Sequence, residues 1–225
     1  MKHIDPLWGV WKIEESSEEL LSLLWNRKAY LSQLEMIKAE QRRREWLASR
    51  VLLQALVEAP SYIAYYPNGA PFLSSSFLHL SISHTKGYAA VLLQEHPAAG
   101  IDIEYRSGRV AKIRRRFMSP REEAGIDKEH EIEHLLLHWC AKETLFKMIG
   151  QEEVDFLRHL HVCPFPYAEE GRFTVCETRT GEGAVYPLNY LVTPDFVLTR
   201  SCNTGTVGMP ASILSLPDFP CSKCL

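Results

Sequence analysis

Two short segments from the first half of this 225-residue chain recur in the second half at nearly the same separation. Gly9-Val10-Trp11-Lys12-Ile13-Glu14 aligns with Gly100-Ile101-Asp102-Ile103-Glu104-Tyr105, which lies 91 residues later (from 9 to 100). Trp46-Leu47-Ala48-Ser49-Arg50 aligns with Trp139-Cys140-Ala141-Lys142-Glu143, which lies 93 residues later (from 46 to 139). Because one pair is patterned like strands and the other like helices, the spacing indicates a duplicated unit. Chance similarity between short apolar segments is the alternative.

The remaining patterns predict an α+β fold, since apolar alternation favours strands and 3.6-residue spacing favours helices. The expected strands cover 7–13, 62–66, 79–83, 88–94 and 100–105, with three more between 159 and 201 and turns at Glu170-Gly171 and Pro194-Asp195. The expected helices begin near Ser16-Ser17 and cover 32–57, 110–117 and 132–149. We therefore expect two similar α/β subdomains in a pseudo-twofold arrangement, each a small antiparallel sheet packed on a long helix. Their expected ranges are 1–99 and 100–202, with an irregular tail at 203–225.

Composition narrows the class of protein. Apolar residues make up 46% and charged residues 24% of the chain, as in soluble globular proteins. The net charge of -3 argues against nucleic acid as the main partner. The sequence predicts neither a membrane helix nor a signal peptide, so we expect a cytoplasmic protein whose six cysteines are reduced. The spacing of Cys221 and Cys224 would also suit a redox or zinc half-site.

Acidic residues carry the strongest chemical signal. Asp102 and Glu104 lie two apart on an expected strand, so both side chains leave one face, with Ile101 and Ile103 on the other. A solvated sheet face is the ordinary explanation of such a triplet. Glu143 shares a helical stripe with Trp139 and Lys147, where an exposed ion pair is the simpler alternative. If the two motifs meet, three oxygen ligands without His or Cys favour Mg²⁺.

Ser81-Ile82-Ser83-His84-Thr85-Lys86-Gly87 supplies a further candidate, because His84 ends a strand beside Lys86 and could bind a phosphate. A hydrogen-bonded structural histidine is the alternative.

These segments together resemble the 4′-phosphopantetheinyl transferase superfamily. Gly100-Ile101-Asp102-Ile103-Glu104, followed by Trp139-x-x-Lys142-Glu143-x-x-x-Lys147, is similar to its signature. Ser83-His84 and the two-unit length resemble the larger Sfp-type branch, in which one chain is a pseudodimer. Such enzymes transfer the phosphopantetheine arm of coenzyme A to a carrier-protein serine and release adenosine 3′,5′-bisphosphate.

The resemblance implies a role for each matching residue. Asp102, Glu104 and Glu143 would bind Mg²⁺, with Glu143 also the base for the carrier serine. Lys147 and its neighbour Lys142 would contact the pyrophosphate region, and Arg50 and His84 the nucleotide phosphates. The first subdomain would then be the nucleotide side, and the second would hold the metal and the catalytic helix.

The sequence departs from the family pattern at Ala70 and Ser49 and, more mildly, at Thr144, which replaces a smaller residue. Ala70, in Asn68-Gly69-Ala70-Pro71, stands where a phosphate-binding lysine is usual, and Ser49 replaces a glycine. Arg42, Arg43 or Lys86 are candidates to replace the missing lysine. Phe117-Met118-Ser119-Pro120-Arg121-Glu122 is similar to the family's aromatic-x-Ser-x-x-Glu segment.

A basic segment from Tyr105 to Arg121 suggests a partner, because it holds seven Lys or Arg residues and no acidic residue. Its place after the carboxylate strand suggests an acidic acyl or peptidyl carrier protein docking near Arg106–Arg121. We expect a monomer that needs neither a membrane nor nucleic acid. The competing prediction is a non-enzymatic module that uses this segment to bind nucleic acid or an acidic protein.

Overall fold

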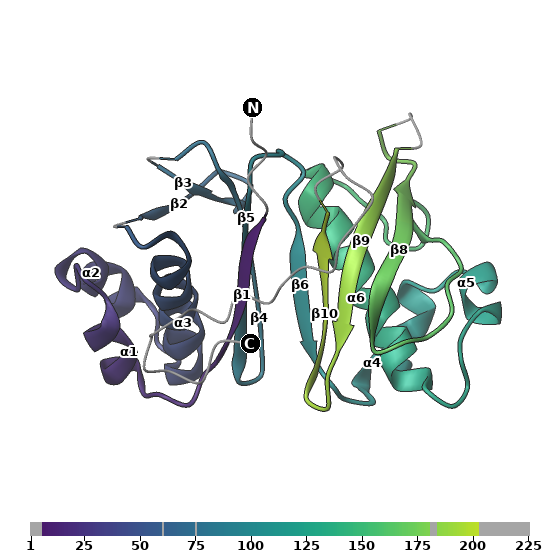
Figure 1. The fold of residues 1–225 in the computed structure, drawn as a ribbon, viewed down its shortest axis with the longest axis horizontal. Helices are drawn as coiled ribbons and strands as arrows, with labels where there is room; N and C mark the ends of the chain where they lie inside the picture. The colour runs from purple at the N-terminus through teal and green to yellow at the C-terminus, as the bar shows by residue number, and fades with distance from the viewer. Residues whose placement is uncertain (1–5, 60, 75, 181–183, 203–225) are drawn as a thin grey trace. The chain divides into compact units, whose positions relative to one another are not determined.

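The computed structural model describes residues 6–59, 61–74, 76–180 and 184–202, and these residues form two compact units (Figure 1). The division falls between Glu95 and His96, shortly before the expected start of the second subdomain at Gly100. The expected tail at 203–225, including Cys221 and Cys224, lies outside the described residues.

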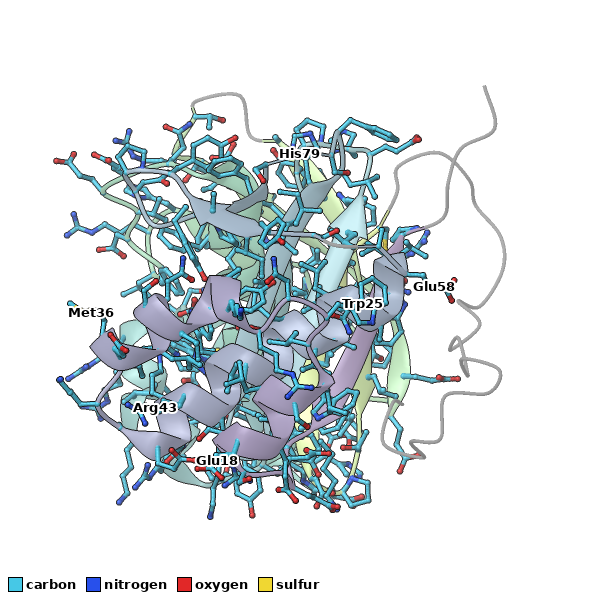
Figure 2. All side chains as sticks on the ribbon, turned by 90° about the vertical axis from the view of Figure 1, so that its left-hand side faces the viewer. Glu18, Trp25, Met36, Arg43, Glu58 and His79 are labelled. Carbon is cyan, nitrogen blue, oxygen red and sulfur yellow. The ribbon has the colours of Figure 1, made fainter. Side chains whose placement is uncertain are left out.

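The N-terminal unit combines one long helix with antiparallel strands. Its elements are β1 (Leu7–Lys12), α1 (Ser17–Leu23), α2 (Lys28–Met36), α3 (Glu40–Val57), β2 (Ile63–Tyr65), β3 (Pro71–Leu73), β4 (His79–Thr85) and β5 (Tyr88–Gln94). The main sheet has the order β1-β5-β4, while β2 and β3 form a separate antiparallel pair. Figure 2 looks onto the helices of this unit, where Met36 at the end of α2 is 80% exposed.

Local chemistry explains where these helices begin and end. Ser16 and Glu19 form a capping box at the start of α1, as the sequence predicts. The expected single helix over 32–57 is wrong, because the chain is extended at Ile37 and two helices result. The Arg43 side chain donates a hydrogen bond of 2.7 Å to the Ile37 carbonyl, which helps to hold the break.

The C-terminal unit has the same kind of composition with a larger sheet. Its elements are β6 (Ile101–Tyr105), α4 (Arg109–Ile113), η1 (Arg114–Arg116), α5 (Pro120–Ala124), α6 (Glu131–Ile149), β7 (Leu160–Val162), β8 (Glu170–Glu177), β9 (Val185–Val192) and β10 (Phe196–Ser201). The sheet is antiparallel in the order β6-β10-β9-β8-β7. Helix α6 packs on this sheet through a largely buried stripe and ends at Gly150, which is left-handed (φ 56°).

Two expectations for this region are wrong. In the described part of the chain, four strands follow α6 instead of three, and Glu170-Gly171 begins β8 instead of forming a turn. Gly171 is needed there because an added Cβ would lie 2.8 Å from the Tyr190 hydroxyl on β9. A glycine inside a strand therefore marks a close approach here and no chain reversal.

The two units share one arrangement of the first strand, the last strand and the long helix. In each, the first strand pairs with the last (β1 with β5, β6 with β10), and the long helix packs on that pair. In each, a glycine lets helix and strand approach: an added Cβ would lie 3.1 Å from Leu52 at Gly9 and 2.6 Å from the Thr144 carbonyl at Gly100. The pseudo-twofold arrangement of the units stays a prediction.

Within the described residues, every helix is too short or too polar to cross a membrane.

Candidate active site on β6 and α6

The acidic strand β6 lies in the core of its unit. Ile101 and Ile103 are buried on one face, and Asp102 on the other face is only 5% exposed. Glu104 is half-buried near the end of the strand. A buried carboxylate is costly unless a charge or hydrogen bonds compensate for its lost hydration. The ordinary explanation of this triplet, a solvated sheet face, is therefore wrong for Asp102.

The stripe on α6 meets these carboxylates directly. Trp139 Nε1 donates to Glu104 Oε1 over 2.9 Å, and Lys147 Nζ donates to Asp102 Oδ1 over 2.8 Å. Lys147 also donates to the Ile101 carbonyl over 2.9 Å. The alternative in which Lys147 pairs with Glu143 along the helix surface does not describe this structure, because Lys147 reaches the neighbouring strand. The two motifs that the sequence separates by about forty residues thus form one cluster.

Glu143 lies between these two contacts on the helix, and its pKa is raised to about 7. Burial is the largest cause, and the negative charges of Asp102 and Glu104 add to it, while Lys147 opposes them. The three carboxylates therefore share one electrostatic environment and favour a positive charge among them. Among the described residues, no three acidic, His or Cys side chains converge tightly enough to form a ligand shell as they stand. The donor set is nevertheless all oxygen, which fits a hard divalent cation.

Lys142 faces away from this cluster and is fully buried. Its ammonium group donates to the Phe117 carbonyl, to Glu122 Oε2 over 3.0 Å and to the Phe156 carbonyl over 3.1 Å. These contacts use all three donors of a lysine. The structure thus gives Lys142 a buried, fully bonded ammonium group, and the contact with the pyrophosphate region that the resemblance implies for it stays a prediction.

Glu122 is the partner that sequence reasoning missed. Ser119 and Glu122 form a capping box at the start of α5, and Glu122 also accepts from the Val162 amide over 2.9 Å. Lys142 helps to lower the pKa of Glu122 against the opposing effect of burial. The spacing of Ser119 and Glu122 was a usable signal for the capping box, but not for the buried partner on α6.

Arg50 lies on α3 of the N-terminal unit and is 3% exposed. Its guanidinium carbon stands 3.4 Å from the centre of the Trp46 ring, and Nη2 donates to the Tyr65 hydroxyl over 3.1 Å. Nη1 donates to the Trp46 carbonyl and the Ser49 hydroxyl. These acceptors are all neutral, and burial lowers the Arg50 pKa. A buried cation with neutral neighbours is suited to an anionic ligand.

His84 contacts the same helix from β4. Its ring bonds to Arg42, and its Nδ1 lies 3.2 Å from Glu45 Oε2. A nearby hollow of about 310 Å³ is lined by polar groups that include Arg44 and Lys86. Ala70 lies at the β2–β3 turn, where its backbone amide donates a hydrogen bond of 3.1 Å to Asn68 Oδ1, and its methyl group has no atom that could bind a phosphate.

The basic segment 105–121 divides into paired and exposed side chains. Arg106 pairs with Glu133, and Arg114 pairs with Glu123 and Glu131. The exposed members are Arg109, Lys112, Arg115, Arg116 and Arg121. Five of the seven basic residues in this segment are therefore exposed.

The stretch that holds this cluster matches a known family. Residues 98–199 match the family model of the 4′-phosphopantetheinyl transferase superfamily. The matched stretch runs from just before β6 into β10, so it includes the three carboxylates and Lys147. No curated protein matches the chain. The match supports the resemblance at the level of the superfamily.

Proposed function

We propose that this protein transfers the 4′-phosphopantetheine arm of coenzyme A to a serine of an acyl or peptidyl carrier protein and releases adenosine 3′,5′-bisphosphate. The observation that carries the proposal is the meeting of β6 and α6 at Asp102, Glu104, Glu143 and Lys147, inside the stretch that matches the superfamily. Because the chain has an N-terminal unit in addition to the unit that matches the superfamily, we assign the protein to the Sfp-type branch.

Asp102, Glu104 and Glu143 would hold Mg²⁺, because they are the three carboxylates that share this environment. When bound, the ion would neutralise charge that develops on the adenosine 3′,5′-bisphosphate leaving group as the pyrophosphate linkage of coenzyme A breaks. Binding would require Lys147 to release Asp102 Oδ1, which it contacts over 2.8 Å. Lys147 is then free to place its ammonium group on a pyrophosphate oxygen, where a fixed positive charge stabilises the transition state.

Glu143 is our candidate for the base, since a serine hydroxyl needs to lose its proton to become a good nucleophile. Its carboxylate would accept that proton directly or through a water. Arg50 and His84 are our candidates for binding the nucleotide phosphates, because Arg50 is a buried cation with neutral acceptors. Arg42, Arg43 or Lys86 are our candidates to replace the lysine absent at Ala70. Lys86 lines the hollow of about 310 Å³ together with Glu45, the partner of His84.

We assign carrier docking to the exposed members of the basic segment. Carrier proteins of this class are expected to be acidic, so charge reversal should weaken their binding. Arg115→Glu/Arg116→Glu should raise KM for the carrier by about tenfold and leave KM for coenzyme A nearly unchanged. Arg114→Gln is the matched control, because Arg114 is occupied by Glu123 and Glu131. Equal changes in both KM values would argue against docking at this surface.

Mass spectrometry of an apo carrier protein tests the function itself. The purified protein, coenzyme A and Mg²⁺ should convert the carrier serine to its phosphopantetheinyl ester, and omission of either small molecule should prevent the product. Several apo carriers from fatty-acid, polyketide and peptide synthesis should be offered. Binding of the carrier without any covalent product from all of them would favour the alternative of a non-enzymatic module.

A further inference from the structure

Two free cysteines occupy neighbouring strands at the edge of the C-terminal sheet. In the register of β7 and β8, His161 faces Cys176 and Val162 faces Val175. The Cys163 amide continues this ladder with a hydrogen bond of 2.9 Å to the Thr174 carbonyl. Because side chains alternate along a strand, Cys163 and Cys176 lie on one face as diagonal neighbours.

The two thiols are both close and accessible. They are diagonal neighbours on one face of the β7–β8 pair, and each residue is partly exposed. Cys140 is fully buried and Cys202 is 7% exposed, so the other two described cysteines are shielded. Among the described cysteines, Cys163 and Cys176 are therefore the pair that an oxidant can reach.

The backbone around Cys163 can adjust. Diagonal residues in a regular pair have Cα atoms about 7–8 Å apart, whereas a disulfide needs about 4.4–6.8 Å. Strand β7 is an edge strand of three residues, and Cys163 follows its last residue. A short displacement of this strand end toward β8 would close the gap without disturbing a central strand.

We propose that Cys163 and Cys176 form a redox-sensitive pair that a peroxide oxidises to an intramolecular disulfide. One thiolate attacks a peroxide oxygen and becomes a sulfenic acid, and the O–O bond breaks with release of water or alcohol. The second thiol attacks the sulfenic sulfur, the S–S bond forms, and a second water leaves. Each sulfur gives up one electron overall, and the peroxide accepts both.

Cys163 is the thiol to which we assign the first attack, because it follows the end of a three-residue edge strand, whereas Cys176 lies within β8. Burial raises the pKa of Cys176, and the neighbouring Cys163 raises it further, which keeps Cys176 in its less reactive thiol form. Two charged groups face Cys176 from α5: Glu122 raises its pKa and Arg121 lowers it. Cys176 then acts as the resolving thiol.

The same displacement of the β7 end would also affect α6, the proposed catalytic helix. The Val162 amide, next to Cys163, donates to Glu122 Oε1 over 2.9 Å, and Glu122 binds Lys142 on α6. Movement of the β7 end therefore acts on the residue that precedes Glu143. Oxidation should change amide hydrogen exchange at 160–163 and along α6 in addition to forming the covalent link.

Peptide mapping tests the proposal on the full-length chain carrying Cys221→Ser and Cys224→Ser, which removes the tail thiols. The protein is treated with hydrogen peroxide, free thiols are blocked with iodoacetamide, and the unreduced digest is analysed by mass spectrometry. We expect a linked peptide pair containing Cys163 and Cys176, lighter by two hydrogen atoms and separated again by dithiothreitol. Recovery of both residues as alkylated thiols, or as separate sulfinic or sulfonic acids, would overturn the proposal.

Two variants identify the pair. In Cys163→Ser, the linked peptide should disappear and overall thiol oxidation should slow by about tenfold, because Cys176 is the less reactive thiol. In Cys202→Ser, the yield of the link should stay the same. A link from Cys176 to Cys140 or Cys202 in Cys163→Ser, or from Cys176 to Cys140 in Cys202→Ser, would contradict the assignment.

Discussion

Helices α3 and α6 occupy corresponding places in the two units but carry groups of opposite charge at corresponding positions. Trp46, Ser49 and Arg50 on α3 correspond to Trp139, Lys142 and Glu143 on α6, each 93 residues later (from 46 to 139). In α3, the tryptophan ring stacks on the Arg50 cation. In α6, the tryptophan donates a hydrogen bond to a carboxylate of β6, while Glu143 faces two further negative charges.

The difference fits our proposal that one arrangement of strand and helix was adapted to two kinds of charged ligand group. In both units a glycine in or before the first strand brings the long helix close to it. The N-terminal strand then offers apolar Trp11 and Ile13 where the C-terminal strand offers Asp102 and Glu104. A buried cation in one unit and clustered anions in the other suit a phosphate and a metal ion respectively. Four changes test this comparison.

The largest expected effect is on catalysis at Glu143. Glu143→Ala should reduce phosphopantetheine transfer by about 10⁴-fold, since it removes both a base and a metal ligand. Its urea unfolding midpoint should be no lower than that of the wild type, because Glu143 is a buried carboxylate beside two others. Transfer rates and unfolding midpoints should be measured on the same preparation.

Glu131→Ala is the control on the same helix, because Glu131 pairs with the exposed side of Arg114. It should keep nearly full activity. A folded Glu143→Ala protein with near-normal turnover would remove the proposed contrast between the two helices.

Sequence patterns predicted the parts of the fold that depend on local chemistry. Strand β5 and the end of α6 at Gly150 lie where they were expected, because apolar alternation and a left-handed glycine are local signals. The contact between Asp102 and Lys147 was not predicted, because the sequence suggested only that the acidic motifs of β6 and α6 would meet. What the sequence suggests about their roles in catalysis stays a prediction.

The features that the sequence did not predict share a physical cause. In each, a contact with a residue outside the local pattern determines the conformation or the burial. Gly171 resembles a turn residue, but its strand position is fixed by Tyr190 on the next strand. The break at Ile37 is held by Arg43. Lys142 resembles an exposed basic residue, yet Glu122 and two carbonyls make it a buried one. None of these partners can be recognised from spacing along the chain.

The second prediction concerns stability at the corresponding positions 142 and 49. Lys142→Met should lower the free energy of unfolding by about 3–5 kcal/mol, because it leaves Glu122 charged and buried. Ser49→Ala should cost about 1 kcal/mol, since it removes hydrogen bonds to the Trp46 carbonyl and Arg50. Urea denaturation of each variant measures both values.

The double variant Lys142→Met/Glu122→Gln tests the cause. It should recover roughly half of the lost free energy of unfolding. The unpaired charge is gone, and a glutamine at 122 can still accept part of the hydrogen bonds from backbone amides. Equal losses in the single and double variants would show that the cost comes from packing and that the ion pair has no special weight.

The third prediction concerns the two glycines. Gly100→Ala should cost about 3 kcal/mol, because its Cβ would lie 2.6 Å from both the Thr144 carbonyl and Met148. Gly9→Ala should cost about 1 kcal/mol, because its closest contact is the end of the Leu52 side chain at 3.1 Å. Thermal unfolding of the two variants side by side measures the difference. A larger loss at Gly9 would mean that α3 approaches its strand more rigidly than α6 does.

The smallest effect is a pH dependence confined to α6. His138 is 3% exposed, and the pKa of its ring is lowered to about 3, chiefly by burial, against the opposing charge of Glu122. The unfolded chain therefore takes up a proton below about pH 6.5 that the folded state refuses, so stability falls as the pH decreases through that value. Between about pH 7 and pH 5, His138 should account for a loss of about 2 kcal/mol. On α3 the corresponding residue is Glu45, 93 residues earlier (from 138 to 45), so no such histidine term arises there.

His138→Phe keeps a ring beside Phe165 and removes the titration. Its urea midpoint should shift less between the two pH values than the wild-type midpoint does, while the exposed control His79→Phe should behave like the wild type. His134, which precedes His138 by one turn and whose Nε2 has no hydrogen-bond partner within the described part of the chain, should leave a residual shift in the same direction. If His138→Phe loses as much stability on acidification as the wild type, the acid sensitivity does not arise from His138, the buried histidine that α6 has and α3 lacks.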